Sequence, residues 1–146
     1  MTGLTPQRLL RERGMRVTAL RRELLKLLLA KRGEPLSHTE IFDQLSAALG
    51  RPPDRVTLYR ALTAFSEARL VHQVQGTDGV ARFCLHEPLR TGCPGNHPHF
   101  LCRLCGRMIC LSEQPLPHVD VPEGTSVEGK QMLLFGVCPV CQDQEK

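Results

Sequence analysis

The chain has 146 residues, 41% of them hydrophobic, which suffices for one ordinary domain or two small ones with a buried core. No apolar run approaches the length that spans a bilayer, and the N-terminus lacks the apolar stretch of a secretion signal. We therefore expect a soluble cytoplasmic protein without a membrane partner. An odd number of cysteines, seven, argues against a disulfide framework and favours metal binding.

Charge is divided unevenly along the chain. Residues 1–69 contain thirteen Lys/Arg and seven Asp/Glu, a net of +6, whereas residues 70–146 contain six and eight, a net of −2. A basic half indicates a polyanionic partner such as nucleic acid. The alternative, a solvated basic helix surface, is common, so the charge alone does not decide.

Helical periodicity and capping residues dominate the basic half. They predict helices at about 5–13, 18–31, 37–49 and 54–68. Ser37 and Glu40 match a capping box at the start of the third helix. Two β-rich runs, 70–75 and 80–85, flank a glycine-containing turn and predict a hairpin. Helices followed by a small hairpin indicate a winged helix-turn-helix.

The remainder of the chain predicts a hinge and a second domain. Residues 87–96 are rich in proline and glycine, as in a hinge, and residues 112–130 resemble a proline-rich loop. Strands are expected at 99–105, 106–111 and 131–138. The fold class is therefore α+β, with a winged-helix domain at 1–86 and a small α/β domain at 97–146.

The fourth predicted helix has two distinct faces. Its apolar face, expected in the core, comprises Leu58, Ala61, Leu62 and Phe65. The opposite face and its N-terminal flank carry Arg55, Thr57, Tyr59, Arg60 and Thr63. A recognition helix presents such residues to the major groove, although an ordinary polar face is an equal alternative. Arg16 is placed to reach the DNA backbone or minor groove, with a solvated arginine as its alternative.

Two CxxC pairs carry the clearest chemical signal. They are Cys102/Cys105 and Cys138/Cys141, and each pair with its tight turn is called a knuckle below. Each pair points two thiolates at one ion, and together they predict a closed, structural zinc site without an open position for catalysis. Disulfides or a thioredoxin-like redox pair are the alternatives, and a reducing compartment disfavours them.

A second cluster lies around the predicted hinge. Cys84 ends the hairpin, His97 and His99 precede the first CxxC pair, and His72 lies nearby in sequence. A mixed sulfur and nitrogen set there would suit a second, regulatory divalent metal. A buried thiol and surface histidines are the alternative interpretation.

The remaining cysteines and histidines receive lesser roles. We expect Cys110 to pack as a small apolar residue within its strand. Cys93 and His86 are loop residues that could serve as spare ligands, and His38 is expected at the surface. His118 is expected in a loop, with a peripheral metal site as the alternative.

Taken together, these features resemble the ferric uptake regulator (Fur) family of metal-sensing repressors. The matching pieces are residues 14–21 (GMRVTALR), 56–62 (VTLYRAL), the hairpin, His97-x-His99 and both CxxC pairs. The resemblance implies a homodimer with a C-terminal dimerisation domain, which binds double-stranded operator DNA when its regulatory metal is present. It implies neither an enzyme nor a small-molecule substrate.

Carried over position by position, the resemblance assigns roles to the residues above. It implies DNA contacts for Arg16, Tyr59 and Arg60. It implies structural zinc at Cys102, Cys105, Cys138 and Cys141, and regulatory ligands at Cys84, His97 and His99, with His72 as a further ligand. Cys84 stands where iron sensors tend to carry a carboxylate, so the chain is most similar to the zinc-uptake regulators.

Two departures from the family pattern concern the C-terminal half. Lys130 replaces a histidine of a third metal site, and the segment 112–130 lacks the usual helix.

We expect a zinc-responsive repressor of metal-homeostasis genes. An iron, manganese or peroxide sensor of the same family is the alternative; a zinc-stapled protein-interaction module and a thiol redox enzyme are disfavoured by the charge division and the paired knuckles.

Overall fold

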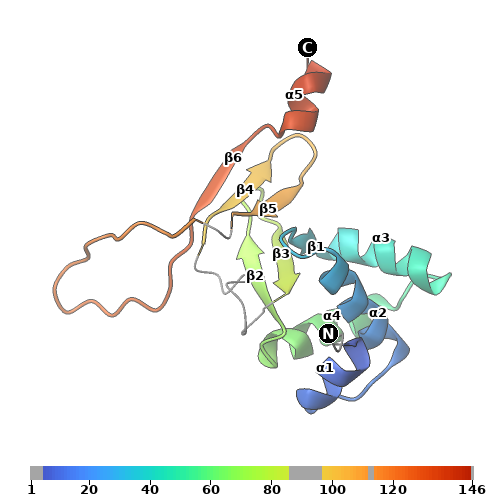
Figure 1. The fold of residues 1–146 in the computed structure, drawn as a ribbon. Coiled ribbons are helices and arrows are strands. Elements are labelled where there is room, and N and C mark those ends of the chain that lie inside the picture. Colours follow the sequence, from blue (N-terminus) through green and yellow to red (C-terminus); the bar gives the residue numbers. More distant parts are fainter. Residues whose placement is uncertain (1–4, 86–96, 112–113, 146) are drawn as a thin grey trace.

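A computed structural model describes residues 5–85, 97–111 and 114–145 (Figure 1). An N-terminal helical unit carries a small sheet, and a second sheet lies beside it with a long loop projecting away. The predicted hinge, 87–96, falls outside the described residues. No helix in the described ranges is both long and apolar enough to cross a bilayer.

Helices form where the sequence predicts them. They are α1 (Pro6–Glu12), α2 (Ala19–Ala30), α3 (His38–Leu49) and α4 (Arg55–Glu67). Each begins after a side chain that accepts a hydrogen bond from the backbone N–H three residues later, so an otherwise unpaired helix donor is satisfied. These capping residues are Thr5, Thr18, Ser37 and Asp54. The predicted capping box between Ser37 and Glu40 is present.

The predicted hairpin is also present and belongs to a three-stranded antiparallel sheet. Its strands are β2 (Val71–Gln75) and β3 (Ala81–Leu85), and β3 also pairs with the two-residue strand β1 (Leu36–Ser37). The sheet order is β1-β3-β2. Sequence periodicity misses β1 because two residues are too few to show an alternating pattern.

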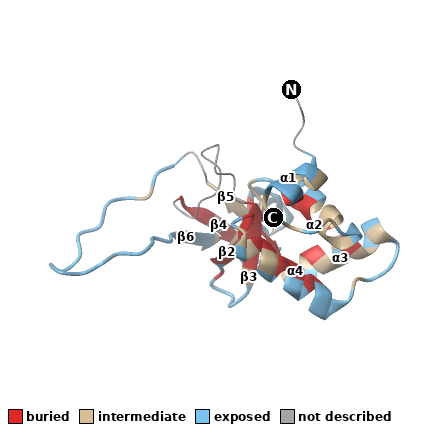
Figure 2. Cartoon of the chain, turned by 90° about the horizontal axis from the view of Figure 1, so that it is seen from below, coloured by how far each residue is buried: buried red, intermediate tan, exposed pale blue. Residues whose placement is uncertain are grey.

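An apolar core fills the N-terminal unit, as the red segments of Figure 2 indicate. Fifteen buried residues from all four helices and the sheet form one cluster. The predicted inner face of α4 is buried as expected, and Phe65 is completely inaccessible. Hydrophobic burial of this kind stabilises the unit without a ligand.

The second sheet contains β4 (His99–Cys102), β5 (Met108–Cys110) and β6 (Leu133–Gly136), in the order β5-β4-β6. A short helix that the sequence analysis did not expect, α5 (Pro139–Glu145), ends the described chain. Strands β4 and β6 are parallel, a pairing that requires a long crossover, usually a helix. Here residues 114–132 form an extended, largely exposed loop instead, in agreement with the predicted loop (Figure 2).

The two units are packed against each other. Val74 of β2 lies in one buried cluster with Leu101 and Met108 of the second sheet. The Cys110 amide donates to the Gly33 carbonyl at 2.8 Å. These apolar and polar contacts bring the hairpin and the second sheet together. Cys84 at the end of the hairpin therefore lies in the same region as His97 and His99 at the start of the second sheet.

Candidate metal centres and nucleic-acid interface

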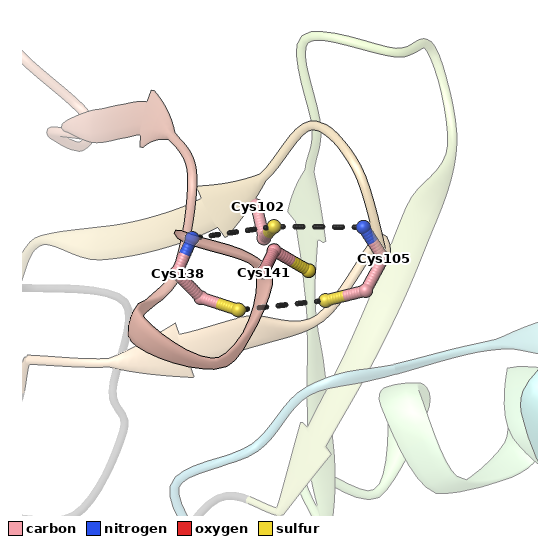
Figure 3. A group of neighbouring side chains, drawn as sticks. All are labelled: Cys102, Cys105, Cys138 and Cys141. Atoms are coloured by element: carbon pink, nitrogen blue, oxygen red, sulfur yellow. Dashed lines mark hydrogen bonds between the residues drawn. The ribbon is translucent and has the colours of Figure 1, made fainter. Parts of the chain in front are cut away.

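The four knuckle cysteines converge at one end of the second sheet, where the parallel strands β4 and β6 both end (Figure 3). Cys102 ends β4 and Cys105 lies in the following turn, while Cys138 follows β6 and Cys141 lies in α5. Their sulfur atoms all lie within 4.8 Å of one another. The spacing that suggested paired knuckles therefore corresponds to one four-sulfur cluster.

Backbone donors favour the charged form of one of these sulfurs. The Cys102 sulfur accepts hydrogen bonds from the amides of Cys105 at 3.5 Å and Cys138 at 3.4 Å. These two donors lower the pKa of the Cys102 thiol to about 6, whereas burial raises that of Cys141 to about 12. A cation would offset the cost of further thiolates, so an all-sulfur, closed set fits Zn²⁺ by its chemistry.

A second cluster forms where the two sheets meet. One candidate ligand atom each from His97, His99 and Cys110 lies within 4.8 Å of the others. The sulfur of Cys84 is 3.6 Å from that of Cys110, although Cys84 is not part of the mutual three-residue group. The structure thus brings three of the four predicted hinge residues to one place and adds Cys110.

Burial keeps both histidines neutral in this cluster. His97 and His99 are 4% and 2% exposed, and their ring centroids are 4.6 Å apart. Burial lowers the pKa of both imidazoles, to about 4 for His99, where the neighbouring His97 adds to the effect. The neutral imidazole is the form that binds metal. The Nε2 atom of His97 is buried without a hydrogen-bond partner among the described residues, as expected of a ligand position.

The sequence analysis gave Cys110 only a packing role, but the structure also places its sulfur in a candidate ligand group. Cys110 is half-buried, and its sulfur lies beside that of Cys84. The pairing of β4 with β5 places Cys110 opposite His99. The knuckle turn sets this register, since Leu101 pairs with Met108. Counting outward from the Cys102-x-x-Cys105 turn pairs Cys110 with His99 from sequence, whereas its proximity to Cys84 depends on how the two sheets pack.

The other possible ligands take different positions. His72 lies opposite Cys84 in the β2–β3 register and is close enough to His99 to lower its pKa further. His118 is exposed on the projecting loop and contacts Asp120 at 2.9 Å. His38, expected at the surface, is half-buried at the start of α3. Cys93 and His86 lie outside the described residues.

The predicted DNA-contacting residues of α4 divide into two groups. Tyr59, 66% exposed, and Arg60 project from the outer face of the helix. The Arg55 guanidinium instead stacks over the Phe42 ring at 4.0 Å, and the Thr57 hydroxyl donates to the Asp54 carboxylate at 2.8 Å. Although both are exposed, these internal partners leave Arg55 and Thr57 less available than Tyr59 and Arg60.

Arg16 lies in the loop before α2, exposed like the outer residues of α4. Its backbone carbonyl accepts a hydrogen bond from the Arg21 guanidinium at 3.1 Å, which fixes the loop at this position. Its exposure is consistent with either the predicted DNA contact or a solvated arginine.

Comparison with known proteins identifies the family. A profile of the ferric uptake regulator family matches residues 12–123, about three quarters of the chain. The chain belongs to this family. It is 27% identical over 138 residues to the ferric uptake regulation protein of Synechococcus elongatus, covering 91% of this chain and 90% of the relative. The peroxide-responsive repressor PerR of Staphylococcus saprophyticus is 29% identical over 140 residues, with 92% and 88% covered.

Solved structures of Fur-family proteins share the fold. The ferric uptake regulator of Vibrio cholerae superposes with a TM-score of 0.65 at 21% identity, over 90% of this chain and 98% of that one. A zinc uptake regulator complexed with zinc and DNA gives 0.61 at 22% identity, over 95% and 91%. Family membership makes the chain a metal-dependent transcription regulator and not an enzyme.

Proposed function

We propose that this Fur-family protein is a zinc-responsive repressor that binds a double-stranded operator as a homodimer and controls metal-homeostasis genes. The observation that carries the proposal is the donor set where the two sheets meet. It offers the sulfurs of Cys84 and Cys110 and the buried imidazoles of His97 and His99.

Ligand softness favours zinc at this second site. Thiolates prefer Zn²⁺ to Fe²⁺ or Mn²⁺, which favour oxygen-rich sites. No carboxylate belongs to the ligand groups found among the described residues. The relatives named as ferric uptake and peroxide-responsive proteins keep iron, manganese and peroxide sensing as the second candidate, which the same experiment tests.

The four knuckle cysteines have a different role in this proposal. Cys102, Cys105, Cys138 and Cys141 hold a structural zinc that ties the end of the chain to β4. A closed four-thiolate site exchanges its metal slowly, so it serves as a staple and not as a sensor. Regulation is assigned to the mixed site, with His72 as its adjacent, more peripheral residue.

The regulatory step follows from where the second set of ligands comes from. Cys84 is on β3 of the hairpin, whereas His99 and Cys110 are on the second sheet. A metal held by both sides binds tightly only in one relative orientation of the units. By linkage, DNA that selects the same orientation raises metal affinity by the same factor, typically about 5–150-fold.

The DNA surface is assigned to the outer face of α4 and the loop before α2. Tyr59 and Arg60 are proposed to contact the major groove, and Arg16 the backbone. Arg55 and Thr57 would contribute mainly by positioning the helix, because their side chains already contact Phe42 and Asp54. Because the proposed homodimer has two recognition helices, its operator needs two half-sites that lie on the same face of the DNA duplex.

The test begins with a duplex selected from random sequence by the zinc-loaded protein, so that no operator is assumed. Its affinity is then measured against buffered zinc, manganese and ferrous iron, and after treatment with hydrogen peroxide, for wild type and Cys84→Ser. Wild type is expected to gain about 5–150-fold in affinity with zinc. Cys84→Ser should lose this gain while retaining the knuckle zinc and its melting temperature.

Matched arginine variants separate DNA contact from metal response. Arg60→Ala should weaken operator binding by roughly 1–3 kcal/mol at every zinc concentration. Arg103→Ala removes the same charge from the exposed knuckle turn and should leave affinity near wild type. A Cys84→Ser protein that responds at the wild-type zinc concentration, or a wild type that responds only to manganese or iron, would contradict zinc sensing.

A further inference from the structure

We propose that Cys84 and Cys110 also form a redox-modification site, at which a hydroperoxide joins them in a disulfide and thereby disables the regulatory metal site. The regulatory consequence rests on the proposed function, whereas the cross-link itself does not. Nothing in the predicted roles of these residues anticipated the pair, because Cys110 was expected to pack as an apolar side chain.

Geometry favours this pair. The two sulfur atoms are 3.6 Å apart, and a disulfide requires about 2.05 Å, so a closure of about 1.5 Å is sufficient. Cys84 lies on β3 of the first sheet and Cys110 on β5 of the second. The bond would therefore connect the two units at the place where their hydrogen bond between Cys110 and Gly33 already holds them together.

Exposure assigns an order to the two sulfurs. Cys84 is 3% exposed, whereas Cys110 is half-buried and so is the sulfur that a small oxidant reaches first. In the first step the Cys110 thiolate attacks one oxygen of the hydroperoxide, whose O–O bond breaks. Cys110 becomes a sulfenic acid, and the second oxygen leaves and is protonated to an alcohol, or to water when the oxidant is hydrogen peroxide.

Conversion of the Cys110 sulfenic acid to a disulfide requires only the neighbouring thiol of Cys84. The Cys84 sulfur, as thiolate, attacks the Cys110 sulfur, the S–O bond breaks, and the departing hydroxide takes up a proton to form water. Overall, two thiols lose two electrons and two protons, and the hydroperoxide is reduced to an alcohol or water, plus one water. The hydroperoxide is the only co-reactant, so atoms and electrons balance.

Metal occupancy distinguishes this pair from the knuckle. In the knuckle, four mutually close sulfurs can all be committed to one slowly exchanging ion. The mixed site is the one whose metal exchanges under the proposed function, so protein without the regulatory metal presents both of its sulfurs to the oxidant. Metal and hydroperoxide then compete for the same two atoms, and oxidation removes two ligands from the regulatory site at once.

The experiment uses the full-length protein with the knuckle zinc retained and the weaker metal removed by mild chelation. Hydrogen peroxide is added with or without excess zinc, remaining thiols are alkylated, and cross-linked peptides are identified by mass spectrometry. We expect a Cys84–Cys110 link, the loss of two alkylatable thiols per chain, and retention of one zinc. Excess zinc should slow the reaction, and a dithiol reductant should reverse it.

Single variants test the assignment and its order. Cys110→Ser should abolish both sulfenic acid and cross-link, whereas Cys84→Ser should abolish the cross-link but leave a sulfenic acid at Cys110 that a dimedone probe captures. Links that instead join knuckle cysteines, equal oxidation rates with and without zinc, or sulfenic acid on Cys84 alone would overturn the proposal.

A DNA-binding readout distinguishes this proposal from the proposed function. Oxidised protein should lose the 5–150-fold zinc-dependent gain in operator affinity. If reduced protein responds to zinc but no Cys84–Cys110 link forms, the redox inference fails and zinc sensing stands. If the link forms but reduced protein does not respond to zinc, the pair is a redox site and the zinc-repressor assignment fails.

Discussion

The two halves of the molecule are stabilised by different means. The N-terminal unit encloses one cluster of fifteen buried apolar residues. In the second unit, one of the two buried clusters consists of Cys102, Cys138 and Cys141. Phe135 of its strand β6 is 65% exposed, so this sheet places a large aromatic outside its own core. The contrast indicates that hydrophobic burial folds the first half, and it leads to the proposal that the second half depends on metal.

The largest effect should come from breaking the proposed metal staple. Cys138→Ser removes one of four ligands, and structural zinc contributes on the order of 10 kcal/mol or more to small domains of this kind. We expect zinc content to fall by about one ion per chain. Amide exchange should lose protection in β4 and β6 and keep it in α4, because the apolar core does not require the ion.

Phe65→Ala is the matched change in the other half. Truncating this fully buried ring should destabilise the N-terminal unit by about 3–5 kcal/mol while zinc content stays at the wild-type value. If Cys138→Ser removed protection equally from α4, or if Phe65→Ala released zinc, the two halves would not be stabilised independently.

A smaller effect is expected at the contact that joins the halves. The Arg82 side chain, 4% exposed, binds both carboxylate oxygens of Asp78 and donates to the Gly106 carbonyl of the knuckle turn at 3.2 Å. The hairpin turn between β2 and β3 packs closely against this guanidinium, because a Cβ at Gly76 would lie 2.5 Å from it. Arg82 thus fixes the tip of the hairpin to the knuckle.

Arg82→Gln should destabilise the protein by roughly 1–3 kcal/mol, because the charge-assisted hydrogen bonds to Asp78 and the bond to Gly106 are lost. Exchange protection should fall in β2, β3 and the knuckle turn together. Asp78→Asn is the control, since it removes the carboxylate that Arg82 holds at a pKa of about 2 but keeps the bond to Gly106. Equal loss of protection at the knuckle in both variants would show that the ion pair, not the Gly106 contact, joins the halves.

The sequence predicts these regions unequally, for physical reasons. Helices, their caps and the inner face of α4 follow from local rules of periodicity and hydrogen bonding, and all were correct. The four knuckle cysteines were predicted because CxxC turns fix local geometry. Cys110 was missed because its neighbour Cys84 lies on another sheet, and the stacking of Arg55 on Phe42 likewise depends on how α3 and α4 pack.

The smallest effect concerns pH and sharpens the contrast at the boundary between the halves. Burial lowers the pKa of His99 from 6.5 to about 4, while the unfolded chain protonates near 6.5. Between these values the unfolded state binds more protons than the folded state, so stability falls as pH is lowered through this window and is unaffected above it. One histidine contributes at most roughly 1.4 kcal/mol per pH unit.

Denaturant titrations of the chelator-treated protein between pH 7 and 5.5 measure this slope. The free energy of unfolding of His99→Gln should depend less on pH than that of wild type, because glutamine does not titrate and the lowered pKa of the buried imidazole is lost. His118→Gln, on the exposed loop, changes the same residue type and should keep the wild-type slope, since its side chain is 81% exposed. The Cys102 thiol, with a pKa of about 6, also titrates in this range, but it is common to all three proteins, so the difference between variants isolates His99. Equal slopes for wild type and His99→Gln would mean that this imidazole is not held neutral at the junction of the two sheets, and its role as a preformed metal ligand would lose its electrostatic basis.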